Sequence, residues 1–320
     1  MSAAEGATTR VAVIGGGTSS EHDVSNATAD SISTTLAGLD EFEVLRMDIT
    51  RCGGWQDADG SALDAAVALG KLARCEVLFG SVHGPGGEDG TLAALASLLG
   101  VAVVGSGLTA GALAMDKWVT KLVAAEVGVQ VAAGRLVRPD DLVTWEGPVV
   151  VKPVAAGSSN GVSLVREPGD LEVALKAAFA EDDRVLVEEV VEGREIDVAV
   201  LRRADGTLLV TPALEVHVDG FFDYDAKYGG SDGTRFEVPA PITGAERAEL
   251  ERQAVDVFEA LGCAGVARVD FFLTERGWVL NEVNTVPGMT ATSQVPLMAA
   301  AAGMTYAELL SDLVRSARVR

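Results

Sequence analysis

The first third of the chain alternates short apolar runs with amphipathic stretches. Val11–Ile14 is an apolar run that ends at three glycines, and the polar residues after them lead into a helical pattern that continues to Leu39. Phe42–Ile49 and Val77–Phe79 are further strand candidates. Strands that alternate with helices predict an open parallel sheet with helices on both faces. Such a sheet binds ligands at the carboxyl ends of its strands.

The pattern changes near Gly105, where we place a domain boundary. An alanine- and leucine-rich helical stretch covers 108–128, and short β-branched runs follow it. The runs 148–154 and 161–165 predict two strands joined by a small flexible loop, which is typical of a hairpin tip. An alanine-rich helix and a strand at 184–191 follow.

The last third of the chain predicts a strand-rich unit with two long helices. Its expected elements are strands at 197–202, 208–211, 267–273 and 278–283, a polar loop at 219–234, and helices at 244–261 and 306–317.

Length and charge restrict the function. A chain of 320 residues is long enough for two or three compact units. It carries 47 acidic and 25 basic side chains, so its net charge of -22 argues against nucleic-acid and membrane partners. The three scattered cysteines suggest neither a disulfide framework nor a zinc site. Neither a signal peptide nor a membrane-spanning run is visible, so we expect a soluble cytoplasmic protein.

The strongest candidate for chemistry is the trio Asp270, Glu282 and Asn284. The turn 274–277 should fold two strands together, so that Asp270 lies close to Glu282 while Glu282 and Asn284 share a face. Two carboxylates and an amide oxygen are the hard ligands that magnesium prefers, with phosphate and water completing the octahedron. In so acidic a chain, a solvated strand face is the alternative.

Three lysines lie beside glycine-rich or small-residue loops, where each could meet a phosphate: Lys117, Lys152 and Lys227. Taken singly, each is also explained as a surface lysine. The loop 157–161 offers backbone N–H groups that could cradle phosphate, although it lacks the ending of a P-loop.

A histidine, His83, begins the glycine-rich segment 83–90 after the strand that ends at Phe79. A parallel sheet presents ligand-binding groups at this place. A histidine among so many glycines is not expected to fill a core, so His83 is a candidate ligand-binding residue. The alternative interpretation is a loop histidine that is hydrogen-bonded to the backbone. His22 and His217 have no equivalent context, and nothing indicates a serine–histidine–acid triad.

Together these segments resemble the D-alanine:D-alanine ligase family, in order and through almost the whole chain. The resemblance rests on 16–25, 83–92, 105–107, 115–117, 151–153, 157–159, 226–228, 265–270 and 284–290. It implies an α/β (α+β) ATP-grasp fold with an N-terminal open parallel α/β sheet at 1–106, a central α+β domain at 107–196, and a C-terminal α+β domain with the metal and substrate site at 197–320. It also implies a homodimer.

The resemblance assigns the ATP-binding residues. By this carry-over Lys117, Lys152 and Lys227 hold phosphates, with Ser158 and Ser159 in the phosphate loop. Glu188, Glu189 and Val190 contact adenine, and Glu195 takes the ribose. Asp270, Glu282 and Asn284 bind two magnesium ions, for which manganese can substitute.

The resemblance also assigns the amino-acid site. Glu21 binds the ammonium of the first substrate, with His83 beside it, while Ser158 and Tyr228 lie near the second amine. Ser293, followed by Gln294, contacts the second carboxylate, and Arg268 with the Gly288 N–H stabilises the tetrahedral intermediate. A carboxylate is a poor acyl donor until it is phosphorylated, and the transferring phosphoryl group needs metal and lysine charge. Closure of the loop 219–234 would keep water from the acyl phosphate.

Two departures from the family pattern affect these expectations. Ala155 and Ala156 replace a charged pair that many members carry before Gly157, which could loosen contacts to the loop 219–234. Gln294 replaces an apolar residue, and an amide beside the acceptor pocket can shift specificity. The sequence therefore predicts a cell-wall D-alanyl-D-alanine ligase, with a ligase of another D-amino acid or amine in a specialised pathway as the alternative.

Two rival classes fit the sequence less well. A nicotinamide-dependent oxidoreductase is suggested by the strand and glycines at 11–17 and the acidic Asp48. However, a serine occupies the place of the third fingerprint glycine, and this class leaves the trio Asp270, Glu282 and Asn284 unexplained. A nucleotide-binding module without catalysis is disfavoured because every charged position of the proposed site is filled.

Overall fold

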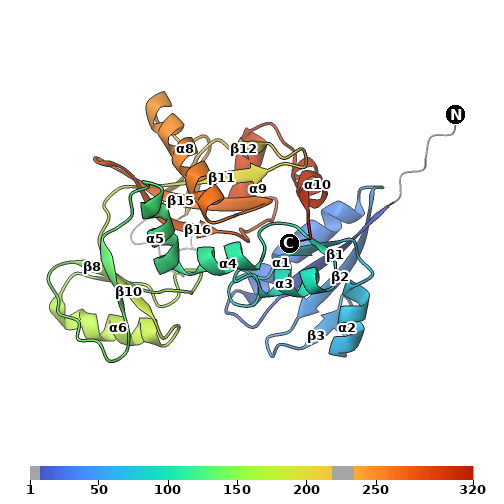
Figure 1. The fold of residues 1–320 in the computed structure, drawn as a ribbon, viewed down its shortest axis with the longest axis horizontal. Helices are drawn as coiled ribbons and strands as arrows, with labels where there is room; N and C mark the ends of the chain where they lie inside the picture. The colour runs from blue at the N-terminus through green and yellow to red at the C-terminus, as the bar shows by residue number, and fades with distance from the viewer. Residues whose placement is uncertain (1–7, 218–233, 320) are drawn as a thin grey trace.

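The computed structural model describes residues 8–217 and 234–319, which form three β-sheets with helices packed against them (Figure 1). The loop predicted at 219–234, with Lys227 and Tyr228, lies outside the described residues apart from Thr234.

The first sheet follows the sequence prediction over four parallel strands. Its strand order is β4-β3-β2-β1-β5-β6, and β1 (Thr9–Gly16), β2 (Phe42–Ile49), β5 (Val77–Gly80) and β6 (Ala102–Val103) are parallel. Two further strands that were not predicted, β3 (Trp55–Asp57) and β4 (Ala62–Leu63), extend one edge of this parallel sheet in antiparallel orientation. The short turn 50–54 can only reverse the chain, because a parallel neighbour needs a longer crossover. Gly53 takes φ +80° in this turn.

Both faces of this sheet are buried, as the apolar runs predict. Val11 and Val13 of β1 join one core with α1 (His22–Ala37), α9 (Gln294–Ala301) and α10 (Tyr306–Ser316). Ala12 and Ile14 point to the opposite core with α2 (Ala65–Leu72) and α3 (Thr91–Leu98). Successive side chains of a strand alternate between the two faces, so β1 serves both cores.

The second sheet carries the predicted hairpin. Its antiparallel order is β7-β10-β8-β9, with α6 packed against it: β7 (Gly134–Val137), β8 (Val149–Pro153), β9 (Ser163–Val165), η1 (Pro168–Asp170), α6 (Leu171–Phe179) and β10 (Val185–Glu189). The loop between β8 and β9 contains Ser158 and Ser159 at φ 52° and 57°. These left-handed conformations are unusual for residues with a Cβ and mark a specialised loop.

The third sheet has the order β14-β13-β11-β15-β16, with β12 beside β11. Its elements are β11 (Arg194–Arg202), β12 (Leu208–Val210), β13 (Leu214–His217), β14 (Arg235–Glu237), α8 (Gly244–Ala260), β15 (Val266–Thr274) and β16 (Gly277–Asn284). The strand pair β15–β16 agrees with the prediction, whereas β13 and β14 were not predicted because they are only four and three residues long. A reciprocal capping box between Thr243 and Glu246 starts α8.

The helical stretch at 108–128 breaks in two. α4 (Leu108–Met115) and α5 (Lys117–Glu126) meet at Asp116, which has extended dihedrals and accepts a hydrogen bond from the Val119 N–H at 2.9 Å. Both helices pack on β16, and α5 also contacts α8. This break places Lys117 at the first turn of a helix.

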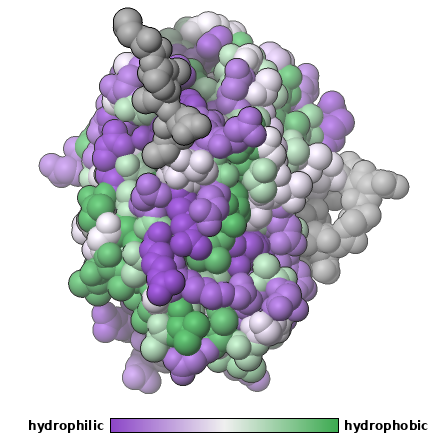
Figure 2. Space-filling model, turned by 90° about the vertical axis from the view of Figure 1, so that its right-hand side faces the viewer, coloured by the Kyte–Doolittle hydropathy of each residue, from purple (hydrophilic) through white to green (hydrophobic). Residues whose placement is uncertain are grey.

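The outer surface mixes hydrophilic and hydrophobic residues on the side that carries the first sheet (Figure 2). Within 8–217 and 234–319, no helix taken singly has both the length and the apolar character needed to cross a bilayer; α9 and α10 meet these criteria only as a pair bent by 104°.

Candidate active site

Two cavities share a wall at the meeting point of the three sheets. The larger, of about 1040 Å³, lies between the second and third sheets, and the smaller, of about 570 Å³, lies next to the first sheet. Four residues line both cavities: Lys117, Ala156, Ser158 and Glu282. A ligand in one cavity that reacts with a ligand in the other would therefore do so beside a lysine, a serine and a carboxylate.

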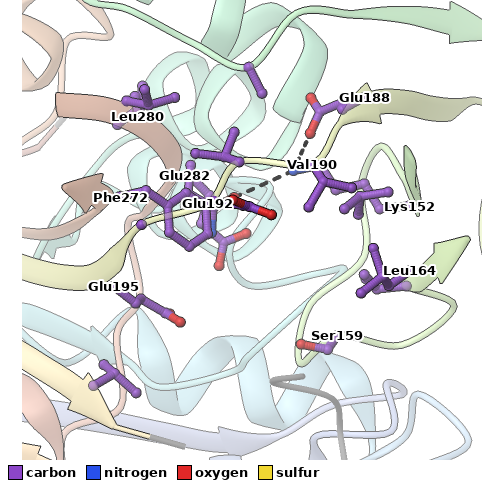
Figure 3. A pocket seen from close by; sticks show the side chains of 18 of the residues that line it. Lys152, Ser159, Leu164, Glu188, Val190, Glu192, Glu195, Phe272, Leu280 and Glu282 are labelled. Atoms are coloured by element: carbon purple, nitrogen blue, oxygen red, sulfur yellow. Dashed lines mark hydrogen bonds and ion pairs between the residues drawn. The ribbon is translucent and has the colours of Figure 1, made fainter. Parts of the chain in front are cut away.

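The larger cavity gathers all the described residues that the resemblance assigns to ATP. Side chains of both sheets point into it (Figure 3). Leu164, Phe272 and Leu280 give it apolar walls suited to a flat base. The predicted residues that line it are Lys117, Lys152, Ser158, Ser159, Glu188, Glu189, Val190 and Glu195.

A buried charge triad forms one end of this cavity. The Glu188 carboxylate receives the Lys121 Nζ at 2.8 Å on one oxygen and the Lys152 Nζ at 2.8 Å on the other. Burial raises the pKa of Glu188, but the two ammonium groups outweigh it and the pKa is lowered. Burial, followed by the charge of Lys152, lowers the pKa of Lys121. Lys121 was not predicted from the sequence, although it lies four residues after Lys117 and therefore on the same helix face.

The loop between β8 and β9 reaches the first sheet. The Ser158 hydroxyl donates to the Glu21 carboxylate, and the Asn160 amide donates to the Ser20 hydroxyl at 2.9 Å. A Cβ on Gly157 would lie 2.5 Å from Glu21 Oε2, so glycine is needed for this approach. Lys117 donates to the Ala156 carbonyl at 2.7 Å. The loop thus forms a wall between the two cavities.

The smaller cavity brings together the predicted amino-acid site. Glu21, His83, Arg268, Gly288, Ser293 and Gln294 all line it. His83 is 4% exposed, its Nδ1 lies 3.6 Å from Glu88, and its backbone N–H donates to Ser25 Oγ at 3.0 Å. Burial lowers the pKa of His83, but the carboxylates of Glu88 and Glu21 together raise it above its usual value.

Ser293 ends a hydroxyl-rich turn at the start of α9. Its Oγ lies 2.7 Å from Thr290 Oγ1 and accepts from the Thr290 N–H at 3.1 Å. A Cβ on Gly288 would lie 3.2 Å from Ser293 Oγ, which keeps the backbone of this turn close to the hydroxyl. The turn thus presents hydroxyl and N–H groups beside the smaller cavity.

The three predicted metal ligands lie on adjacent strands. Asp270 of β15 is directly opposite Glu282 of β16, and Arg268 is opposite Asn284, so these side chains share a face. Glu282 Oε2 lies 3.3 Å from Lys117 Nζ. Glu282 lines both cavities and Asn284 the smaller one, whereas Asp270 is 3% exposed and is not among the lining residues. Three oxygen donors on one face fit a magnesium site, because the ion takes oxygen ligands and keeps several waters.

Arg268 occupies part of this face. Its Nε and Nη2 each donate to one oxygen of Asp270 at 2.7 Å, and its pKa is raised. Burial opposes the charged form of Arg268, but Asp270, Asp197 and Glu282 outweigh it. The Asp270 oxygens retain lone pairs for a cation, and the guanidinium stays charged at the edge of the smaller cavity.

A second acidic group near the larger cavity was not predicted. Ligand atoms of Glu215, His217 and Glu237 lie within 4.8 Å of one another. However, the Glu215 carboxylate is already bound by Arg194, whose Nε and Nη2 donate at 2.8 and 2.5 Å. We therefore assign this group to an ion-pair network of β11, β13 and β14.

The fold and the two cavities define the class of ATP-grasp carboxylate–amine ligases. A family profile described as "D-ala D-ala ligase C-terminus" matches residues 140–315. The chain is 37% identical to the D-alanine–D-alanine ligase of Corynebacterium aurimucosum over 97% of this chain and 98% of that protein. It is 39% identical to that of Mycolicibacterium smegmatis over 98% and 96%. The chain belongs to the D-alanine–D-alanine ligase family.

Solved structures agree with this assignment. The VanG D-Ala:D-Ser ligase from Enterococcus faecalis is 31% identical with a TM-score of 0.83, over 96% of this chain and 98% of that one. The D-alanine-D-alanine ligase from Coxiella burnetii is 28% identical with a TM-score of 0.84, over 97% and 93%. The predicted family and ATP-grasp fold are thus confirmed.

Proposed function

We propose that the protein joins two molecules of D-alanine into D-alanyl-D-alanine, using ATP and releasing ADP and phosphate. The observation that carries this proposal is the shared wall of the two cavities. Within the described residues the two cavities meet at Lys117, Ala156, Ser158 and Glu282, so a carboxylate in the smaller cavity can reach a terminal phosphate in the larger one there. The carboxylate oxygen attacks the phosphorus, ADP leaves, and a second amine then displaces phosphate from the acyl carbon.

On the nucleotide side, Lys117 and Lys152 bind phosphates, and Glu188, Glu189 and Val190 bind adenine. Glu195 binds the ribose, Ser158 and Ser159 contact phosphate, and Lys227 completes the set from outside the described residues. Asp270, Glu282 and Asn284 hold two magnesium ions, which manganese can replace. These ions would supply positive charge to the phosphate oxygens.

On the amino-acid side, Glu21 binds the ammonium group of the first substrate, and His83 supports it. Ser158, whose hydroxyl donates to the Glu21 carboxylate, and Tyr228, which is outside the described residues, are the proposed contacts of the second amine. Ser293 and Gln294 bind the second substrate. Arg268 and the Gly288 N–H stabilise the charge that develops on the acyl oxygen.

A second candidate is a ligase with another acceptor, such as D-serine. The Gln294 amide lines the smaller cavity, and a structurally similar protein is named as a D-Ala:D-Ser ligase. Measuring ADP formation with D-alanine alone and with D-alanine plus D-serine or other D-amino acids separates the two. Strict dependence on D-alanine at both positions supports the first candidate, and a faster rate with a mixed pair supports the second.

We also propose that the enzyme acts in peptidoglycan precursor synthesis in the cytoplasm, as a homodimer, with the three domains 1–106, 107–196 and 197–320. The free thiols of Cys52, Cys75 and Cys263 fit a reducing compartment. Light scattering of the purified protein tests the dimer, because a mass near 33.0 kDa would show a monomer.

A further inference from the structure

Three carboxylates lie in a row across adjacent strands beside the smaller cavity. Asp197 of β11 is directly opposite Asp270 of β15, which is directly opposite Glu282 of β16. Asp197 is 1% exposed and was not among the predicted site residues. Like charges directly opposite each other in a sheet repel, so this row requires positive charge and hydrogen-bond donors between its members.

Arg268 and Gln294 supply these contacts. The Arg268 Nε lies 3.8 Å from Asp197 Oδ2, and its Nη1 donates to Gln294 Oε1 at 2.7 Å. The Gln294 Nε2 donates to Asp197 Oδ2 at 2.5 Å. Guanidinium only donates and carboxylate only accepts, so the amide can be oriented in only one way.

Asp270 and Gln294 bind different nitrogens of the Arg268 guanidinium. Asp270 binds two of the guanidinium nitrogens, but its oxygens are also proposed to bind magnesium. The Gln294 Oε1 accepts a hydrogen bond from the remaining terminal nitrogen of Arg268, and the Gln294 Nε2 donates to Asp197. The pair Asp197–Gln294 is therefore an anchor for Arg268 that does not depend on Asp270.

We propose that Asp197 and Gln294 are positioning residues that fix the Arg268 guanidinium at the acyl oxygen. This inference rests on the proposed function and deepens it. Gln294 follows Ser293 as the first residue of α9, so the anchor also connects Arg268 to the turn that is proposed to bind the second carboxylate. Both polar ends of the Gln294 amide are engaged within the protein, so the residue aligns Arg268 while it also lines the smaller cavity.

The experiment exchanges the carboxylate and amide groups of the two residues and keeps the length of each side chain. Asp197→Asn and Gln294→Glu are made singly and together. The double variant has the same total charge, and its new amide at position 197 can donate to the new carboxylate at position 294, which also accepts from Arg268. We expect each single variant to lower kcat roughly ten- to hundredfold with the KM for ATP unchanged, a size typical of supporting residues around a catalytic group. The double variant should recover most of the lost kcat and of any lost melting temperature.

Gln253→Leu is the matched control, because Gln253 is a buried glutamine of α8 whose amide donates to Glu249 at 2.7 Å, away from both cavities. It should lower the melting temperature and leave kcat unchanged. The proposal is overturned if either single variant keeps the wild-type kcat. It is also overturned if the kcat of the double variant does not exceed that of the less active single variant. If the wild-type protein forms no ADP with any D-amino-acid pair, the proposed function fails instead, and the recovery of melting temperature in the double variant still tests the pair.

Discussion

Among single residues, Glu188 is held from both sides in the larger cavity, because two buried lysines bind its two oxygens. Replacing Lys121 by methionine keeps an unbranched side chain that is one atom shorter and removes one of these charges. Charge-assisted hydrogen bonds contribute about 1.5–3 kcal/mol, so we expect the KM for ATP to rise at least about tenfold. The amino-acid KM values should not change, since Lys121 lines only the larger cavity.

Initial rates at varied ATP check this prediction. Lys176→Met is the control, because Lys176 lies on α6, outside both cavities, and should give wild-type kinetics. An unchanged KM for ATP in folded Lys121→Met protein would show that Lys121 is not needed to hold Glu188 in the arrangement that binds ATP.

His83 makes the stability depend on pH in a defined direction. Its pKa in the folded protein is raised above the ordinary value of 6.5 by Glu88 and Glu21, against the effect of burial. The protonated ring therefore stabilises the fold below pH 6.5, and this contribution is lost as pH rises through the folded pKa. Urea unfolding of wild type and His83→Gln should give a stability difference that is largest at acid pH and shrinks above neutrality. A difference that grows with pH would contradict the assignment.

The residues most readily predicted from sequence were those near glycine-rich or strand-end motifs. Lys117, Ser158 and Glu282 line both cavities, whereas Lys152 lines the larger one and Glu21 the smaller one. Lys121 and Asp197 were missed because a buried charge is recognisable only by its partners, which come from distant strands.

Among the elements, the loop between β8 and β9 of the second sheet contacts Ser20 and Glu21, which follow β1 of the first sheet. Its Gly157 packs against Glu21, so a methyl group at this position must displace the carboxylate or the loop. We expect Gly157→Ala to raise the KM for the first D-alanine and to lower kcat by roughly tenfold or more, since a small misplacement of a reacting group is costly.

Gly169→Ala is the control for this change. Gly169 lies in the short helix η1, and a Cβ there would meet no atom within 4 Å. Both variants are compared by steady-state kinetics and thermal melting. Wild-type kinetics in Gly157→Ala would mean that the contact with Glu21 does not set the geometry of the site.

Elements were predicted best where their hydrophobic pattern was long. The sheet strands β1 and β2 and the pair β15–β16 agree with the sequence analysis. The break at Asp116 was not predicted because alanine and leucine favour helix on both sides of it. Only the hydrogen bond from the Val119 N–H to the Asp116 side chain marks the start of the second helix. Short polar strands such as β14 depend on their neighbours for stability, so their own pattern is weak.

For the whole molecule, the larger cavity lies between two sheets, so its ligand should bind only the folded chain. A nonhydrolysable ATP analogue with magnesium, at about 100 times its Kd, should raise the free energy of unfolding by about 2.7 kcal/mol. Thermal melting with and without the analogue measures this shift. Lys152→Met should reduce it, because Lys152 lines the cavity and binds Glu188. No shift at saturating analogue would argue against a nucleotide site.

Following the carboxylate oxygen of the first substrate tests the acyl-phosphate reaction most directly. D-Alanine labelled with oxygen-18 in its carboxylate is incubated with ATP, magnesium and the enzyme, and the released phosphate is examined by mass spectrometry. Because the carboxylate oxygen attacks phosphorus and leaves with it, we predict one labelled oxygen in the phosphate for each dipeptide formed. Dipeptide formed with unlabelled phosphate would contradict an acyl-phosphate reaction at the shared wall of the two cavities.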